Sequence, residues 1–503
     1  MKFREFFGGN RPEELAKAGY DDPEMEVPGD VEELHAALEK MDQEEDGVPV
    51  DLVAPKISLE DEAVTGKEEQ EKRERLRVVA KNIVDCFGFN PEKESFLVIT
   101  DGKVVAENGV FIEAIRAELE GRTTSNQRTK GNFEIIIVPT SGKSATPFGG
   151  VIGDKLRDRP VLIVTSMSRS HSKEVGSALR HEISPKEKFE ETLSSPRLRE
   201  LAEAGFSAHP VEFLDGVAKS GLSDEYYRKM QIYIASQKGI RLISITKGHN
   251  PYEILTRGAV EESVEVLRER AEKVDKLMAD VEEVHITSPL GTDLFLRPRH
   301  DKKEVEDGRI DEPGKIANYP IGEWSCSPFQ EGADGVLVVD GPIGGNHNLD
   351  MVKKYGPLRL EIKNGVVTRI NDISLADVIS KVDAGVTTGN PLVDSVVKYL
   401  HEGQNDVYAF RLAELGIGIN GKACKDKPDE WIGSSEGEKI YRTIHIAFGS
   451  NGTFGVDRSD PTFNDCNIHC DNVVGVQTPI TVECTKKDGT KFYLIKNGKP
   501  QEY

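Results

Sequence analysis

A His-Cys-Asp triplet near the C-terminus offers the first residues that could do chemistry. His469 and Asp471 lie two positions apart in the segment NIHCDNVVG, and side chains two positions apart on a strand point to the same face of a sheet. A histidine nitrogen and a carboxylate that converge in this way suit a transition-metal ion. An N-capping aspartate beside a hydrogen-bonded histidine is the alternative, because such pairs also arise by chance. The pair alone leaves metal binding open.

Three further residues upstream have settings like that of the pair. Glu323 follows a turn in NYPIGEW, Glu414 precedes a glycine turn in AELGIGIN, and His445 lies in the strand-like IHIAFG. A carboxylate on an apolar or glycine-rich element is costly to bury without a partner, and a cation is one partner that offsets the cost. Exposure at strand ends is the competing interpretation for each glutamate taken singly.

The cysteines give a weaker ligand hypothesis. The chain has six, none of them in the CxxC spacing of a zinc site, so reduced thiols are expected. Cys466 and Cys470 flank His469 closely enough to be considered as ligands. A buried free cysteine, however, is more often a small apolar side chain.

Other motifs that suggest chemistry are rejected. The segment TSGKSATPFGG (140–150) contains Gly-Lys-Ser, but Ile137 stands where a phosphate loop needs its first glycine,. No nucleotide or other organic cofactor site is therefore assigned. The lone histidines His285 and His347 lie beside strands or glycines and are expected to be hydrogen-bonded structural residues. His171 has the neighbours of a plain loop and is left out of the site.

Composition limits the classes of function. The 503 residues are 37% hydrophobic and 30% charged, with a formal net charge of −22. This length allows two or three domains, and the negative charge disfavours nucleic acid and anionic membranes as partners. A small peptide or another small molecule fits better as substrate. No apolar run approaches the roughly 20 residues that span a bilayer, and the N-terminal segment lacks a signal-peptide pattern, so a cytoplasmic protein is expected.

The N-terminal part of the chain is predicted to contain an extension and an α/β domain. Residues 1–66 are interpreted as an acidic, partly disordered extension, since residues 1–50 carry fifteen acidic against five basic side chains,. Residues 67–284 are interpreted as an α/β domain with a mainly parallel sheet, because β-rich runs alternate with helical periodicity. The expected strands are 95–100, 133–139, 160–166 and 237–246, and the expected helices are 111–121 and 259–283.

Residues 285–503 have a different pattern and are interpreted as an α+β domain. Short alternating runs separated by glycine turns predict a curved, largely antiparallel sheet that carries the candidate ligands. Asp488-Gly489 between two such runs is typical of a hairpin. Helical periodicity covers 374–382 and 391–403,.

Taken together, these motifs resemble the aminopeptidase T family, the thermophilic leucyl aminopeptidases that bind a pair of divalent ions. The resemblance makes the chain a divergent member and extends from about residue 77 to residue 500. The shared motifs are SPLGTDL (288–294), Asn318–Glu323, Glu414–Asn420, His445–Gly449 and the final His-x-Asp. The N-terminal half matches only in its α/β rhythm.

The resemblance implies a site, a reaction and an assembly. The implied metal ligands are Glu323, Glu414, His445, His469 and Asp471, holding two ions of Zn, Co or Mn. It also implies a carboxylate shortly before His445, for which Glu438 is the nearest match at a different spacing. The implied reaction removes N-terminal residues from peptides by metal-activated water, with Glu323 and Glu438 as the acid/base candidates. A homodimer is the implied assembly.

The chain departs from the peptidase pattern at one point, and two alternatives follow. A tyrosine is expected shortly after His445, and SNGTFG stands there instead. The first alternative resembles the dihydroxypyridine ring-cleaving dioxygenases, in which His445, His469 and Asp471 would hold a single Fe(II). Retention of Glu323 and Glu414 favours the hydrolase. The second alternative is a non-catalytic metal-binding protein, which is expected if the ligands do not converge.

Overall fold

A computed structural model of the chain describes most of the C-terminal half and part of the N-terminal half. The described residues are 67–122, 133–138, 159–164, 241–245, 255–313, 315–345, 347–401, 406–456, 460–466, 468–501 and 503. The acidic extension 1–66, the Gly-Lys-Ser loop and His171 lie outside them, so the predictions made there stay predictions. None of the described helices is both long and apolar enough to cross a membrane.

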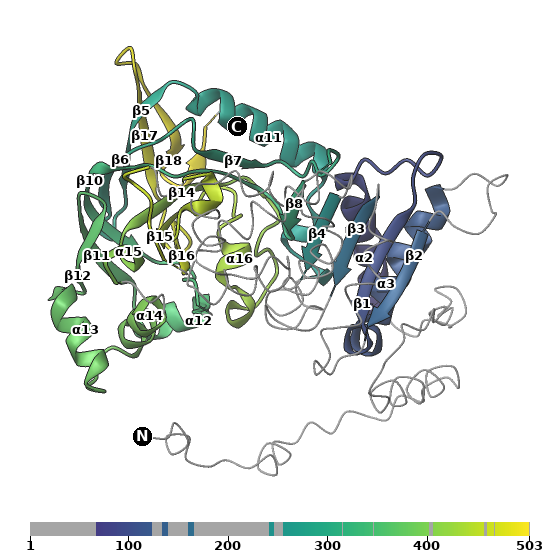
Figure 1. Cartoon of the computed structure of the whole chain (residues 1–503), viewed down its shortest axis with the longest axis horizontal. Coiled ribbons are helices and arrows are strands. Elements are labelled where there is room, and N and C mark those ends of the chain that lie inside the picture. The colour runs from purple at the N-terminus through teal and green to yellow at the C-terminus, as the bar shows by residue number, and fades with distance from the viewer. Residues whose placement is uncertain are drawn as a thin grey trace, which may run out of the picture.

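A parallel sheet, here sheet A, forms the N-terminal part, as the alternating pattern predicts (Figure 1). Its strands run in the order β2-β1-β3-β4-β8, and every neighbouring pair is parallel. They are β1 (Phe96–Asp101), β2 (Phe133–Val138), β3 (Pro160–Val164), β4 (Arg241–Ile245) and β8 (Ile316–Asn318). The first four confirm the strands expected from sequence. β8 follows residue 284 in the chain but belongs to sheet A, so the predicted boundary at 284/285 does not separate the sheets. Whether it separates two domains stays a prediction.

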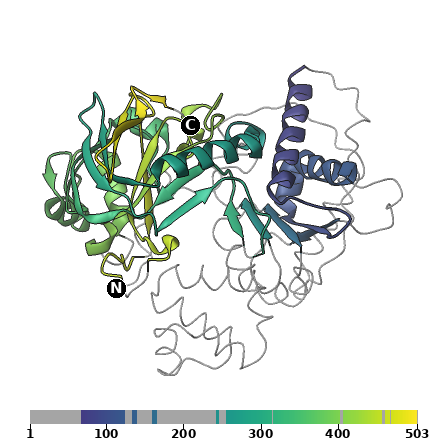
Figure 2. The same cartoon turned by 90° about the horizontal axis from the view of Figure 1, so that it is seen from above.

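Two helices pack with sheet A. In α2 (Lys67–Cys86), Leu76, Ala80 and Ile83 recur at helical spacing and are fully buried, which is the stripe that an amphipathic helix presents to a core. α3 (Gly102–Arg122) contains the expected helix 111–121 and lies against α2. Figure 2 shows both helices grouped with the strands of sheet A at one side of the molecule.

The helix expected over 259–283 is shorter than the charge and apolar pattern predicts. α11 spans Val264–Met278, and its N-cap Ser263 accepts a hydrogen bond from the backbone of Val266. This cap fixes the helix start. The end is earlier than predicted because Val281–Thr287 forms strand β5, whose backbone pairs with two other strands. The charged helix therefore leads directly into a sheet.

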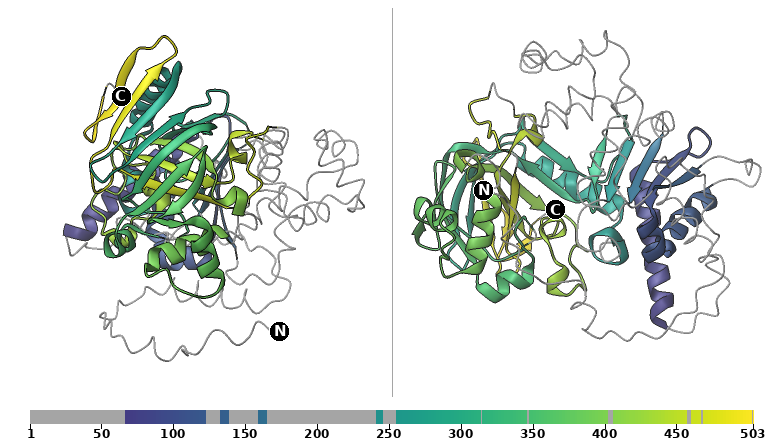
Figure 3. Two further views of the ribbon diagram at one scale, coloured as in Figure 1. Left: turned by 90° about the vertical axis from the view of Figure 1, so that its left-hand side faces the viewer. Right: turned by 60° about the horizontal axis from the view of Figure 1, so that its bottom comes forward.

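Two antiparallel sheets form the C-terminal part, in agreement with the predicted largely antiparallel architecture. Sheet B has the order β13-β12-β11-β10-β6-β5-β17-β18-β19 and forms a curved layer (Figure 3). Its remaining strands are β6 (Asp293–Arg297), β10 (Phe329–Val339), β11 (Leu358–Lys363), β12 (Val366–Ile370), β13 (Ile373–Ser374), β17 (Thr481–Lys486), β18 (Lys491–Lys496) and β19 (Lys499–Pro500). The hairpin predicted at Asp488-Gly489 joins β17 and β18, and Gly489 has the positive φ of 84° that such turns require,.

Sheet C lies inside the C-terminal part and has the order β16-β15-β14-β9-β7. Its strands are β7 (Lys303–Glu306), β9 (Glu323–Cys326), β14 (Leu412–Gly418), β15 (Ile444–Gly449) and β16 (His469–Val474). Every residue of β9, β14 and β15 is buried, so both faces of these strands are covered. The side chain of Gln330 in sheet B donates a hydrogen bond of 3.2 Å to the carbonyl of Leu412, which joins the two sheets.

Helices cover one end of sheet B. α13 (Leu375–Asp383) and α14 (Pro391–His401) confirm the two helices predicted from periodicity, and they contact each other. α12 (Leu349–Tyr355) packs against α14. The short helices α15 (Asp406–Ala409) and α16 (Ser434–Gly437) precede β14 and β15, and α16 leads into the segment that brings Glu438 to sheet C.

Candidate metal centre

Four adjacent strands of sheet C carry the candidate ligands. His469 and Asp471 begin β16, His445 lies in β15, Glu414 lies in β14 and Glu323 begins β9. The register places Asp471 opposite Ala447 on one side, and Glu414 opposite the same Ala447 on the other. Residues separated by about 150 positions in the chain therefore meet because neighbouring strands are in register.

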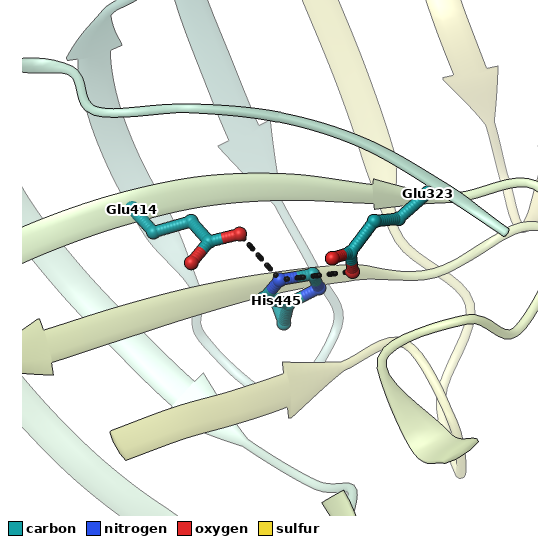
Figure 4. Close-up of side chains that lie close together, drawn as sticks. All are labelled: Glu323, Glu414 and His445. Atoms are coloured by element: carbon teal, nitrogen blue, oxygen red, sulfur yellow. Dashed lines mark hydrogen bonds and ion pairs between the residues drawn. The ribbon is translucent and has the colours of Figure 1, made fainter. Parts of the chain in front are cut away.

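The carboxylate of Glu414 lies between the two histidines. Its Oε1 is 3.1 Å from Nε2 of His445, and its Oε2 is 2.7 Å from Nε2 of His469. Glu323 approaches His445 from the other side, with 3.6 Å between Oε2 and Nε2 (Figure 4). Asp471 Oδ1 lies 3.1 Å from His469 Nε2. The ligands of one ion at about 2.1 Å are separated by about 3.0–3.4 Å, so these spacings suit a shared ion.

The ligand atoms fall into three overlapping groups, each within 4.8 Å. The groups are Glu323/Glu414/His445, Glu414/His469/Asp471 and Glu438/His445/Asp471. The structure therefore brings together all six residues singled out from sequence, including Glu438, whose spacing differs from the family pattern. The two histidines are in different groups, and Glu414 and Asp471 each belong to a group with either histidine.

Two further observations indicate that the residues of this centre fit a metal ion. Oε2 of Glu323 is buried and has no hydrogen-bond partner, and an unsatisfied buried carboxylate oxygen is costly unless a cation contacts it. Nδ1 of His469 lies 2.6 Å from the carbonyl oxygen of Ser450, which turns Nε2 toward the carboxylates. Metal-binding histidines are typically oriented by such a contact.

A glycine makes room for the ring of His445. Gly416 faces His445 across the β14–β15 pair, and a Cβ at Gly416 would lie 1.9 Å from Cε1 of that ring. Any other residue at this position would displace the imidazole. Sequence reasoning treated this glycine as part of a turn, whereas it lies inside the strand β14 and serves a close approach.

Burial and mutual charge set the protonation of the centre. Burial raises the pKa of Glu323 well above its usual range and that of Glu438 to about 7. Burial acts in the same direction on Glu414, but contacts with His445 and His469 outweigh it and lower the pKa of Glu414 to about 2. Burial lowers the pKa of His445, yet the neighbouring carboxylates raise it to about 10. Without an ion, the protonated ring of His445 thus contributes positive charge to the centre, and a bound cation would replace its proton,.

Lys439 is the charged residue of the centre that sequence reasoning missed. Its Nζ lies 2.8 Å from Glu306, 2.8 Å from Oε1 of Glu323 and 3.2 Å from Oε1 of Glu438. Burial lowers the pKa of Lys439, but these carboxylates outweigh it and hold the pKa well above the usual value. Its place next to Glu438 in the chain was the available signal. Lysine is rarely buried, so the sequence alone favoured a solvated side chain.

The weaker candidates belong to none of the potential metal groups among the described residues. Cys466 and Cys470 are buried, and neither belongs to a potential metal group among the described residues. His347 contacts the Gly344 carbonyl and Ser395 Oγ, and His285 contacts Asp293 and stacks on Phe295. Both histidines therefore have the structural environments expected of them.

The position after β15 also departs from the peptidase pattern in the structure. The segment Gly452–Phe454 forms a 3-10 turn, and Phe454 packs with Val456 and Phe463. Phe454 has no hydroxyl group that could contact an ion or a substrate. The missing tyrosine is therefore not replaced by another hydroxyl-bearing aromatic residue in this turn.

Part of the chain matches a known family. Residues 228–427 match the model of a family described as NicX: 2,5-dihydroxypyridine 5,6-dioxygenase. The matched range includes Glu323 and Glu414 and ends before His445. No curated protein matches the chain.

Two solved structures are similar over most of their length. The 2,5-dihydroxypyridine dioxygenase from Pseudomonas putida KT2440 superposes with a TM-score of 0.50 at 14% identity, covering 86% of this chain and 98% of that one. AmpT from Thermus thermophilus superposes with a TM-score of 0.49 at 16% identity, covering 85% of this chain and 99% of that one. The dioxygenase likeness is one of fold. With the family match, the comparisons support the dioxygenase alternative better than the aminopeptidase interpretation.

Proposed function

We propose that this chain is a metal-dependent enzyme that binds one Fe(II) ion and opens a hydroxylated aromatic ring with dioxygen. The observation that carries the proposal is that Asp471 belongs to one potential metal group with His469 and to another with His445. Two histidines and one carboxylate form the ligand set of many non-haem iron oxygenases and leave positions open for oxygen and substrate. The family match over residues 228–427 supports a dihydroxypyridine as the substrate class.

The residues of the chain divide the work at the centre. His445, His469 and Asp471 would hold the ion, with the His469 ring oriented by the carbonyl of Ser450. Iron, when bound, would supply the redox chemistry that joins dioxygen to the ring. Both oxygen atoms enter the product of a dioxygenase, so no external reductant is required. Glu438, with its pKa raised by burial to about 7, is suited to take a proton from a ring hydroxyl and return it.

A second candidate is an aminopeptidase-like hydrolase, and one observation favours it. Glu323 and Glu438 add two carboxylates to the same cluster, which makes enough oxygen ligands for two divalent ions. Two ions can activate a bridging water and polarise an amide carbonyl. In this candidate, Glu323 and Glu438 keep the acid/base roles assigned from sequence.

One reconstitution experiment separates the two candidates. The protein is stripped of metal and reloaded anaerobically with Fe(II), Zn(II), Co(II) or Mn(II). Each form is then assayed for oxygen uptake with 2,5-dihydroxypyridine and for amine release from amino-acid anilides. Oxygen uptake of one equivalent per ring, only with Fe(II), supports the dioxygenase. Amine release with the other ions supports the hydrolase, and no activity in either assay rejects both.

His445→Ala provides the test that ties activity to the centre, and His285→Ala provides its control. His285 is also a histidine in contact with an aspartate, but it lies on sheet B, outside the potential metal groups. The proposal requires His445→Ala to abolish the activity and His285→Ala to keep it. Equal loss in both variants would indicate a general effect of removing a histidine.

A further inference from the structure

Lys439 is a buried cation placed directly beside the candidate metal centre. Its side chain is 6% exposed, and the three carboxylates of Glu306, Glu323 and Glu438 surround its ammonium group. We propose that the ammonium group of Lys439 takes the place of a second metal ion, so that this centre holds one ion and not two. This inference rests on the proposed function, which requires a metal at the centre.

Two glutamates connect the ammonium group to the candidate ligands in the way that bridging carboxylates connect two ions. Oε1 of Glu323 lies 2.8 Å from Nζ of Lys439, while Oε2 lies 3.6 Å from Nε2 of His445. Glu438 has Oε1 at 3.2 Å from the same Nζ, and it also belongs to the group with His445 and Asp471. In a two-ion centre the ions lie about 3.5–4 Å apart and share such carboxylates.

The ammonium group and a second ion exclude each other. Both would draw on the negative charge of the same two carboxylates, those of Glu323 and Glu438, whose Oε1 atoms already contact the ammonium group. Like charges a few ångströms apart in a buried site also repel strongly. A second ion therefore cannot enter unless Lys439 withdraws.

The backbone around Lys439 limits such a withdrawal. The carbonyl of Lys439 accepts a 2.9 Å hydrogen bond from the amide of Asn420, and its own amide donates to Glu436 at 3.1 Å. The side-chain amide of Asn420 in turn donates to the carbonyls of Ala259 and Ile321. Hydrogen bonds thus fix the backbone of Lys439 to segments from three parts of the chain. Its ammonium group in turn positions the carboxylates of Glu323 and Glu438.

The test counts bound ions in variants of Lys439. Metal-free protein is dialysed against excess Co(II) and then against buffer, and bound cobalt is measured per chain by elemental analysis. We expect one ion in the wild type and two in Lys439→Met, because Glu323 and Glu438 then lack their cation. Lys439→Arg keeps the charge and should bind one.

Lys427 supplies a matched control. It is also a buried lysine, 2% exposed in its side chain. It pairs with the buried Glu436, which stands two residues before Glu438 in the chain. Lys427→Met removes a buried ammonium group without touching Glu323 or Glu438, so it should keep one ion. Two ions in this control would overturn the inference by showing that loss of any buried lysine opens a site.

A second variant keeps the test valid if Lys439→Met does not fold. Glu306→Gln/Lys439→Met leaves fewer unpaired buried charges and retains both bridging glutamates, so two ions are again expected. One ion in every variant would overturn the inference and leave the proposed function standing. Two ions in the wild type would overturn the inference and the one-iron proposal together. One ion in the wild type and two in Lys439→Met, with no ring opening, would reject the proposed function alone.

Discussion

Sheet A and sheet C both contain strands that are buried on their two faces, but they bury different chemistry. The described side chains of β1 and β3 include Leu97, Val98 and Leu162, all fully buried. Sheet C buries Glu414 and His445 to a similar degree. Apolar side chains gain stability from burial, whereas ionisable side chains lose their hydration.

The difference teaches where stability and function are located in this molecule. Sheet A follows the rule for parallel sheets covered on both faces, whose strands are rich in Val, Ile and Leu. Sheet C is antiparallel, carries ionisable side chains on four adjacent strands, and keeps the buried charges by pairing them with each other and with Lys439. Perturbed ionisable groups gathered in this way are characteristic of functional sites.

The largest expected effect comes from removing a ligand of sheet C. His469→Ala should lower the affinity for a divalent ion more than about 100-fold, since loss of an orienting partner alone costs 10–100-fold. Calorimetric titration of the metal-free protein measures the affinity. His347→Ala is the control, because the ring of this histidine contacts Gly344, Ser395 and Tyr399 and belongs to none of the potential metal groups among the described residues. Unchanged affinity in His469→Ala would remove His469 from the metal centre.

Sheet A should respond in the opposite way. Leu162→Ala in β3 leaves a cavity at a fully buried position and should lower the free energy of unfolding by about 2–5 kcal/mol. The number of ions bound by the folded protein should not change. Urea unfolding and elemental analysis measure the two quantities. A change in metal content would show that a cavity in sheet A reaches the metal centre through the hydrophobic cluster that the two sheets share.

Much of this contrast was predictable from the sequence, and particular residues show why. Alternating β-rich and helical runs predicted β1 to β4 because parallel sheets with buried strands leave a strong apolar signal. Glu323, Glu414 and His445 were singled out because a charged residue within an apolar or glycine-rich run is unusual. Their approach to one another depends on strand register, which a single sequence does not specify.

Lys439 and Gly416 mark what could not be predicted. The sequence places Lys439 beside two acidic residues in a polar segment, which is also the pattern of an exposed turn. Only the fold brings Glu306 and Glu323 to its ammonium group. Gly416 has a role only because His445 lies across from it on the next strand. The predicted length of α11 was wrong for a similar reason, because strand pairing of β5 overrides the helical pattern after Met278.

Gly416 provides a test of how precisely sheet C is built. Gly416→Ala should displace the His445 ring, lower the free energy of unfolding by about 1–3 kcal/mol and weaken metal binding,. Gly121→Ala is the matched control, because a Cβ there meets nothing within 4 Å and the position lies in helix α3. Thermal unfolding and metal titration measure both effects. Equal stability of the two variants would show that the ring adjusts without cost.

The smallest expected effect comes from an ion pair outside the centre, between Asp460 and Arg299. Burial acts to raise the pKa of Asp460, but Arg299 at 2.7 Å and the hydroxyl of Thr462 outweigh it and lower the pKa to about 2. Because the pKa of Asp460 in the folded state lies below its ordinary value of 3.8, the stability that this ion pair contributes is present above about pH 4 and is lost as the pH falls toward 2. Asp460→Asn should therefore lower the free energy of unfolding by on the order of 1 kcal/mol at pH 7. Urea unfolding at both pH values should show this difference shrinking toward zero near pH 2, and a difference that stays constant would mean that the charge of Asp460 does not contribute.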